Sequence, residues 1–291
     1  MASREDNGAM LRAMPVVFVL IWSTGFIVAR YGMPHAPPLK FLSVRYALSL
    51  LCFGAWIAAR RAPWPRNRSQ WLHLGVCGTL IHAGYLGGVW AAVKAGLGAG
   101  TVALVVGLQP VLTAVWVSFN GGRDSHVSRR QWTGLLLGFS GLLLVVWRKL
   151  GGEITPANLG LALFALVAIT VGTLYQKRFV APTDVRTANF VQILCALAVT
   201  LPLAAFEQEA LVPHVQLIGA LAWSVFGLTL GGSSLLYMLI QRGAATKVTS
   251  LLYLVPPCTA AMAWLLFGEP ITATMVGGMA LIAAGVALVV R

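Results

Sequence analysis

The stretch Val105–Val117, VVGLQPVLTAVWV, decides how this chain folds. It lies inside an uncharged run, residues 95–122, longer than the about 20 residues that cross the hydrocarbon core of a bilayer. In water, Pro110 would break such a helix because proline lacks a backbone N–H. Inside a bilayer, neighbouring helices can satisfy the freed carbonyl, so an interrupted span is tolerated where it lines a cavity.

The same pattern recurs near the other end of the chain as Leu251–Ala263, LLYLVPPCTAAMA. Pro110 matches Pro256, and the threonine three residues later, Thr113, matches Thr259. A duplicated, proline-interrupted membrane helix is typical of transport proteins.

A second repeated block relates the ends of the two halves. GLLLGFSGLLLVVW at residues 134–147 parallels GMALIAAGVALVVR at residues 278–291, with glycine at the first and eighth places of both. We therefore predict two repeats, residues 14–150 and 157–291, with five spans each. Because five is odd, the second repeat must enter the membrane from the opposite side, which gives an inverted repeat.

The predicted fold is all-α, a polytopic membrane protein of ten transmembrane helices in two inverted five-helix repeats. The ten apolar segments run approximately over residues 14–33, 39–59, 71–93, 99–119, 131–148, 157–176, 187–206, 215–240, 247–267 and 271–290.

Composition agrees with a membrane protein. The chain is 58% hydrophobic and 10% charged, whereas soluble domains carry about 25% charged residues. The net charge of +13 comes from basic residues in short gaps between apolar runs, as in loops beside anionic lipid headgroups. They form no compact basic surface, so nucleic acid is not an expected partner, whereas membrane lipid is.

Lysine and arginine also predict the orientation. With a cytoplasmic N-terminus, fifteen of them fall on the cytoplasmic side, five on the opposite side, and Arg45 lies within a span. This bias places both termini in the cytoplasm. The four cysteines lie in four different apolar runs, so neither a disulfide framework nor a zinc site is expected, and no other metal or cofactor is indicated.

These features resemble the EamA-type transporters of the drug/metabolite transporter superfamily. The segment LLFGEPIT, residues 265–272, looks much like the corresponding part of that family's repeat, whereas the first half reads NGGRDSHV at residues 120–127. The resemblance implies a multi-pass protein of the cytoplasmic (inner) membrane that moves a small-molecule substrate through a central cavity.

Ionisable groups within spans are chiefly His82 and Arg45. His82 lies near the centre of the third segment, and Tyr85 follows on the same helical face. His82 either binds substrate or carries a proton, or it is a packed histidine bonded to a neighbouring helix. For Arg45 we favour a structural role, in which it reaches headgroups or pairs with a loop acid, over attraction of a substrate carboxylate or phosphate.

Gln109, Thr113 and Trp116 form a polar stripe beside Pro110. Such a stripe either hydrogen-bonds a ligand or holds helices together. Hydroxyl and aromatic side chains within other spans extend the candidate set, although serine and threonine often bond their own helix. The predicted substrate-binding residues are Trp22, His82, Tyr85, Gln109, Thr113, Thr173, Ser233 and Tyr253.

Three GxxxG pairs allow close helix approach: Gly84–Gly88, Gly134–Gly138 and Gly227–Gly231. We interpret the first and third as packing within the bundle. The fifth and tenth segments carry few polar groups, which makes them candidates for a scaffold or for contact in a homodimer.

We predict a secondary transporter for small metabolites or drugs, with amino-acid-like or amphiphilic solutes favoured by an aromatic, largely neutral lining. The alternatives are a polytopic membrane enzyme and a non-transporting membrane scaffold. The histidines are scattered rather than clustered, so no enzyme activity is expected. The sequence lacks an ATP-binding motif, so a gradient or exchange would drive transport.

Overall fold

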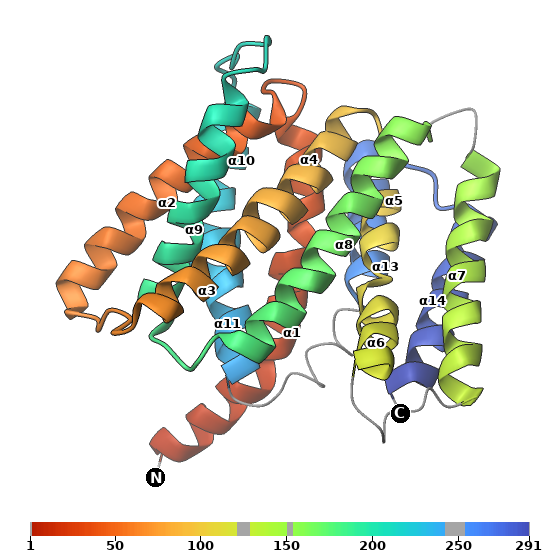
Figure 1. Cartoon of the computed structure of the whole chain (residues 1–291). Coiled ribbons are helices and arrows are strands. Elements are labelled where there is room, and N and C mark those ends of the chain that lie inside the picture. Colours follow the sequence, from red (N-terminus) through yellow and green to blue (C-terminus); the bar gives the residue numbers. More distant parts are fainter. Residues whose placement is uncertain (1, 121–128, 150–153, 242–253, 291) are drawn as a thin grey trace.

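The structure, a computed structural model, describes residues 2–120, 129–149, 154–241 and 254–290, which form helices joined by short loops. Figure 1 shows their arrangement. The elements of the first half are α1 (Ala2–Gly32), α2 (Pro38–Arg60), α3 (Arg68–Gly78), η1 (Thr79–Leu86), α4 (Gly87–Lys94), α5 (Ala99–Val106), α6 (Gln109–Asn120) and α7 (Arg129–Lys149). Those of the second half are α8 (Pro156–Phe179), α9 (Val185–Ala204), α10 (Val215–Trp223), η2 (Ser224–Ser233), α11 (Ser234–Gln241), α13 (Val255–Phe267) and α14 (Ala273–Val290).

Helix length and composition agree with a multi-pass membrane protein. Within the described ranges, five helices are long and apolar enough to cross a bilayer, namely those over residues 38–60, 68–94, 156–179, 185–204 and 215–239. Shorter apolar helices over residues 16–32, 99–113, 132–145, 255–267 and 273–285 overlap the other five predicted segments. The all-helical prediction is confirmed, whereas the count of ten membrane crossings stays a prediction.

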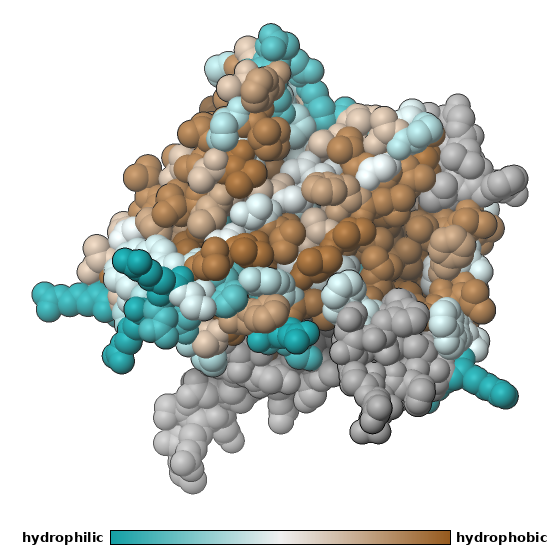
Figure 2. All heavy atoms as spheres, viewed as in Figure 1, coloured by the Kyte–Doolittle hydropathy of each residue, from teal (hydrophilic) through white to brown (hydrophobic). Residues whose placement is uncertain are grey.

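The exterior is suited to lipid along the helices. Large apolar side chains such as Leu51, Phe164 and Val215 are exposed. In Figure 2, brown side chains cover most of the helical flank, and teal ones gather at the upper loops and at the lower ends of the helices. An apolar flank between polar ends is the surface that a bilayer solvates.

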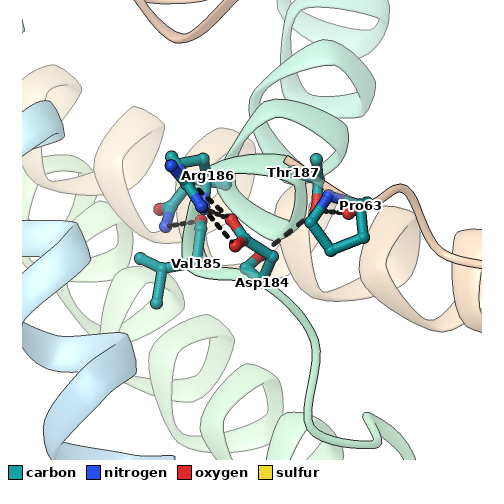
Figure 3. A network of polar contacts seen from close by, with 6 residues as sticks. Pro63, Asp184, Val185, Arg186 and Thr187 are labelled. Atoms are coloured by element: carbon teal, nitrogen blue, oxygen red, sulfur yellow. Dashed lines mark hydrogen bonds and ion pairs between the residues drawn. The ribbon is translucent and has the colours of Figure 1, made fainter. Parts of the chain in front are cut away.

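The chain begins and ends at the same end of the bundle (Figure 1). At that end the loop before α3 meets the start of α9, where the Thr187 hydroxyl donates to the Pro63 carbonyl over 3.0 Å (Figure 3). Asp184 caps α9 by accepting from the Arg186 N–H at 2.9 Å. The Arg186 guanidinium also pairs with the same carboxylate, at 2.7 Å.

Helices from corresponding predicted segments of the two halves pack against each other: α2 on α9 (second and seventh segments), α5 on α13 (fourth and ninth), and α7 on α14 (fifth and tenth). The last pair meets backbone to backbone. A β-carbon on Gly141 would collide with Gly278, and one on Gly285 would collide with Gly134 and Gly138. The contact positions rise along α7 as they fall along α14, so the two helices are antiparallel, as expected for inverted repeats.

This seam, defined as the contacts among Gly134, Gly138, Gly141, Gly278 and Gly285, uses the second GxxxG pair inside one chain. Packing within the bundle is also confirmed for Gly84 and Gly88, which lie against α8. Gly227 differs, because it lies against Trp223 of its own span.

The repeated proline motif marks helix starts. α5 ends at Val106, a short turn follows, and Pro110 is the second residue of α6. Pro256 is likewise the second residue of α13. Proline suits this place because the first N–H groups of a helix have no partner within it. The two motifs touch, since a β-carbon on Gly107 would lie 2.9 Å from the Pro256 ring.

Two carboxylates cap helix starts contributed by the other half. Glu207 accepts from the backbone N–H groups of Leu39 and Lys40, at 2.9 and 2.8 Å, where α2 begins. Glu269 accepts from Ala99 at 3.2 Å, where α5 begins. Because the N-terminus of a helix carries partial positive charge and unpaired N–H groups, a carboxylate there stabilises it. The caps also tie the two halves together.

Candidate functional site

A widened helical turn interrupts the third and the eighth predicted segments at their centres. The π-helices η1 and η2 occupy these places, between α3 and α4 and between α10 and α11. π-helical turns occur frequently at functional sites. His82 and Tyr85 lie in η1, and Thr229 and Ser233 lie in η2, so both widened turns carry predicted or polar residues.

The first cavity, of about 700 Å³, lies among α1, α2, η1, α4, α8, α9, η2 and α11. Both halves of the chain supply its walls. Aromatic side chains make up part of the lining, and the residues are Trp22, Phe26, Tyr85, Trp90 and Tyr237. The lining also contains polar side chains, namely Arg45, His82, Gln176, Asn189, Gln192 and Ser233. A mostly apolar space with a few polar groups is typical of small-molecule sites.

A second cavity of about 510 Å³ adjoins the first, sharing Trp22, Phe26, Tyr85 and Leu236 with it. Its other lining residues include Gln109, Pro110, Thr173 and Pro256, so both repeated proline motifs reach it. The Gln109 amide donates to the Thr173 hydroxyl over 3.1 Å, which joins α6 to α8.

Six of the eight predicted binding residues line one or both cavities: Trp22, His82, Tyr85, Gln109, Thr173 and Ser233. Thr113 is not among the lining residues of the two cavities, and its hydroxyl donates to the Gln109 carbonyl of its own helix at 2.9 Å. Tyr253 lies outside the described residues. The six are brought together in space, and their role in binding stays a prediction.

Arg45 is the charged side chain of the first cavity. It is 3% exposed, and its Nε donates to the Thr229 hydroxyl over 3.0 Å. Thr229 in turn donates to the Ser224 carbonyl five residues earlier, at 2.8 Å, a spacing that the π-helix provides. The prediction that Arg45 reaches headgroups or pairs with a loop acid is wrong, because its partner Thr229 lies inside the bundle.

His82 is 5% exposed and lies beside Gln192 of α9. Their closeness does not produce a hydrogen bond of good geometry, and the Nε2 atoms of both residues lack a partner among the described residues. The backbone at His82 is held from α2, since the Tyr46 hydroxyl donates to the His82 carbonyl over 2.7 Å. Both residues line the first cavity, and each has a buried Nε2 atom whose hydrogen-bonding capacity is unused among the described residues.

The family of the chain follows from comparison with known proteins. The model of the EamA-like transporter family matches twice, over residues 13–147 and 158–291. The chain belongs to the EamA-like transporter family. Two matches in one chain agree with the two-repeat fold, although the boundaries predicted above, 14–150 and 157–291, stay predictions.

Relatives of this EamA-like chain carry transporter names. A "Probable amino-acid metabolite efflux pump" of Salmonella typhimurium is 26% identical over 97% of this chain and 94% of the relative. The "Uncharacterized transporter YvbV" of Bacillus subtilis is 26% identical over 93% and 88%. The "Uncharacterized inner membrane transporter YedA" of Escherichia coli is 24% identical over 87% and 81%.

The fold also matches a known crystal structure. That structure aligns with 94% of each chain at a TM-score of 0.66 and 19% sequence identity. This likeness concerns the fold alone. The EamA-like chain is thus a multi-pass transporter-family protein whose two cavities lie between its halves.

Three amides at the cavity of the EamA-like chain were missed by sequence reasoning: Gln176, Asn189 and Gln192. Each is an amide side chain within a predicted apolar segment. Polar groups inside membrane spans cluster at functional sites, so this feature of the sequence could have indicated them. Among the described residues, no group of three or more His, Cys, Asp or Glu lies close enough to hold a metal ion.

Proposed function

We propose that this chain is a secondary transporter that moves small metabolites or drugs across the cytoplasmic membrane by alternating access. One observation carries the proposal: both halves of the chain line the same cavity, and both contribute polar side chains to it. Arg45 and His82 of the first half face the same space as Gln192 and Ser233 of the second. If the inverted halves rock about their contacts, such a space opens to one side of the membrane at a time.

The enzyme alternative finds less support in the geometry. General acid–base catalysis needs a base that is held in place by an orienting partner. The polar groups of the cavity are instead spread around its wall and are not paired for proton transfer. His73, the other histidine of that span, bonds the Tyr175 hydroxyl at 2.8 Å and is not among the cavity residues. We therefore assign no enzyme activity, and the scaffold alternative leaves the cavity without a role.

The solutes that suit this lining are amphiphilic and amino-acid-like. Trp22, Phe26 and Trp90 offer apolar faces, and the amides and Arg45 offer hydrogen-bond donors in the same lining. The names of the relatives, one an amino-acid metabolite efflux pump and one an inner membrane transporter, point the same way. Both termini are proposed to be cytoplasmic.

A thermal-shift screen of the detergent-purified chain against amino acids and their derivatives would test the proposal. Ligands that raise the unfolding temperature bind the folded state. Each would then be tested by counterflow in proteoliposomes, with protein-free liposomes as the control. Saturable counterflow of at least one such solute is expected, and a chain that binds and moves none of them would overturn the proposed function.

A further inference from the structure

Arg45 is a fully buried cation whose guanidinium has one hydrogen bond to a neutral group, the Thr229 hydroxyl. Its Nη1 atom has no hydrogen-bond partner among the described residues. The same side chain is one of the lining residues of the first cavity, so the buried, unpartnered Nη1 belongs to a residue that borders this space.

The acidic side chains that the structure describes are engaged elsewhere. Asp184 pairs with Arg186, and Glu209 pairs with Lys94. Glu207 and Glu269 cap the starts of α2 and α5. None of these four carboxylates lines either cavity. Within this part of the chain, the protein itself therefore supplies no counter-ion for Arg45.

A buried charge without a partner is costly, because it has lost water and gained no opposite charge. A ligand anion that reached the cavity would supply that charge, and an arginine fork suits a carboxylate. We propose that Arg45 binds the carboxylate of the transported solute, which makes small monocarboxylates with an apolar body the substrate class. This assignment rests on the proposed function.

The surroundings of Arg45 distinguish a carboxylate from a phosphate. Arg45 is the sole lysine or arginine among the lining residues of the two cavities. One fixed cation balances a monoanion, whereas a phosphate dianion would leave a negative charge in an apolar space. The unpartnered Nε2 atoms of Gln192 and His82 provide further polar contacts, and Trp22, Phe26 and Trp90 offer surfaces for the apolar body.

The test compares two pairs of probes on the detergent-purified full-length chain. The pairs are 3-phenylpropanoate with 3-phenylpropanamide, and L-phenylalanine with L-phenylalaninamide. Binding is measured by tryptophan fluorescence, since Trp22 and Trp90 line the cavity. Because a hydrogen bond to a charged group contributes more than a neutral one, the carboxylate of at least one pair should bind at least about tenfold more tightly than its amide.

The outcomes separate the two proposals. Equal affinity for acid and amide in every pair that binds would overturn the role of Arg45 and leave the proposed transporter standing. Binding of none of the four probes would overturn the proposed solute class, and the role of Arg45 with it.

Variants test the residue itself. Arg45→Gln should abolish the preference for the carboxylate, and Arg45→Lys should keep part of it because the positive charge remains. Arg186→Gln, the same exchange at the start of α9, should keep the preference within about twofold, as expected for a distant site. An Arg45→Gln chain that elutes as a single folded species with the wild-type preference would overturn the assignment. If it does not fold, Arg45→Lys and the wild-type comparison still decide.

Discussion

His82 and Gln109 are two of the polar residues that the first half contributes to the lining of the two cavities. His82 presents its ring from the widened turn η1, and Gln109 presents its amide from the start of α6. They differ in one respect. Gln109 already donates to Thr173, whereas His82 Nε2 has no partner among the described residues.

We expect His82→Ala and Gln109→Ala to lower uptake or efflux about tenfold, the effect of losing one or two hydrogen bonds to a bound solute. Membrane abundance should stay at the wild-type level, because each change shortens one side chain at a cavity wall. Transport is measured in cells and abundance by immunoblot. Gln208→Ala, in an exposed loop, is the matched control. Normal transport by both variants would remove the site assignment.

The pair Asp184–Arg186 makes stability depend on pH. Hydrogen bonds from the Arg186 side chain hold the pKa of Asp184 below its ordinary value of 3.8. A lowered pKa means that the contribution is present above about pH 5 and is lost as the pH falls below about 4. Because the pair lies at a partly exposed helix end, we expect less than about 1 kcal/mol.

Asp184→Asn tests this, since asparagine keeps the cap and removes the charge. The wild-type chain should unfold at a slightly higher temperature than the variant at pH 7, and the gap should narrow as the pH falls below the ordinary pKa of 3.8. A gap that is constant from pH 7 to pH 3.5 would assign the effect to something other than ionisation of Asp184.

The sequence predicted some residues of the site and missed others for a physical reason. Gln109 was found because a proline marks the place of an interruption. Gln192 and Arg45 were missed or misread because helices buried on several sides have no simple polar stripe. Which way such a side chain points depends on how its helix is rotated against its neighbours, and that is set by packing across the two halves.

At the level of the helices, the caps supplied by Glu207 and Glu269 predict that removing a capping charge lowers the stability of the fold. Glu207→Gln removes the charge from the start of α2 but leaves the size of the side chain unchanged, and should cost about 1 kcal/mol. Glu209→Gln is the control two residues away, where the exposed pair with Lys94 contributes little. Thermal unfolding in detergent measures both. Equal shifts for the two variants would show that the cap is not the stabilising contact.

The glycine seam between α7 and α14 gives a second expectation at this scale. Gly285→Ala places a β-carbon against the backbone of Gly134 and Gly138, and backbone cannot move aside as a flexible side chain can. We expect a loss of about 1–3 kcal/mol, as for overpacking in a core. Gly160→Ala on α8, with nothing within 4 Å, should be neutral. Wild-type stability of the Gly285 variant would contradict the seam.

The helical elements themselves were largely predictable. Long apolar runs and the proline motif located the spans and the break between α5 and α6. The widened turns η1 and η2 were not foreseen, because a π-helix has the same apolar composition as the α-helix around it. The two differ in the backbone hydrogen bonds, which join residues five apart in a π-helix and four apart in an α-helix. Contacts from neighbouring helices help to stabilise the wider turn, as the Tyr46 hydroxyl does by donating to the His82 carbonyl.

For the whole molecule, the arrangement in Figure 1 sets a topology that labelling can check. Single cysteines at Arg61 and Arg186, in a chain whose own four cysteines are replaced, should react with a membrane-impermeant maleimide from the same side. A cysteine at Gln208 should react from the other side. Labelling of Arg61 and Arg186 from different sides would end the proposed topology. A homodimer stays a prediction, and the seam glycines are already used within the chain.

The reciprocal nature of the glycine seam also limits how far the two halves can diverge. Each half contributes the glycines at the first and eighth places of its repeated block. Gly134 packs against Gly285, and Gly141 packs against Gly278, so each glycine leaves space for the backbone of the other half. A larger side chain at one of these glycines would therefore collide with the backbone of the other half, which cannot move away without disturbing its own helix. The two halves can therefore change more freely on their lipid-facing surfaces than along this line of contact.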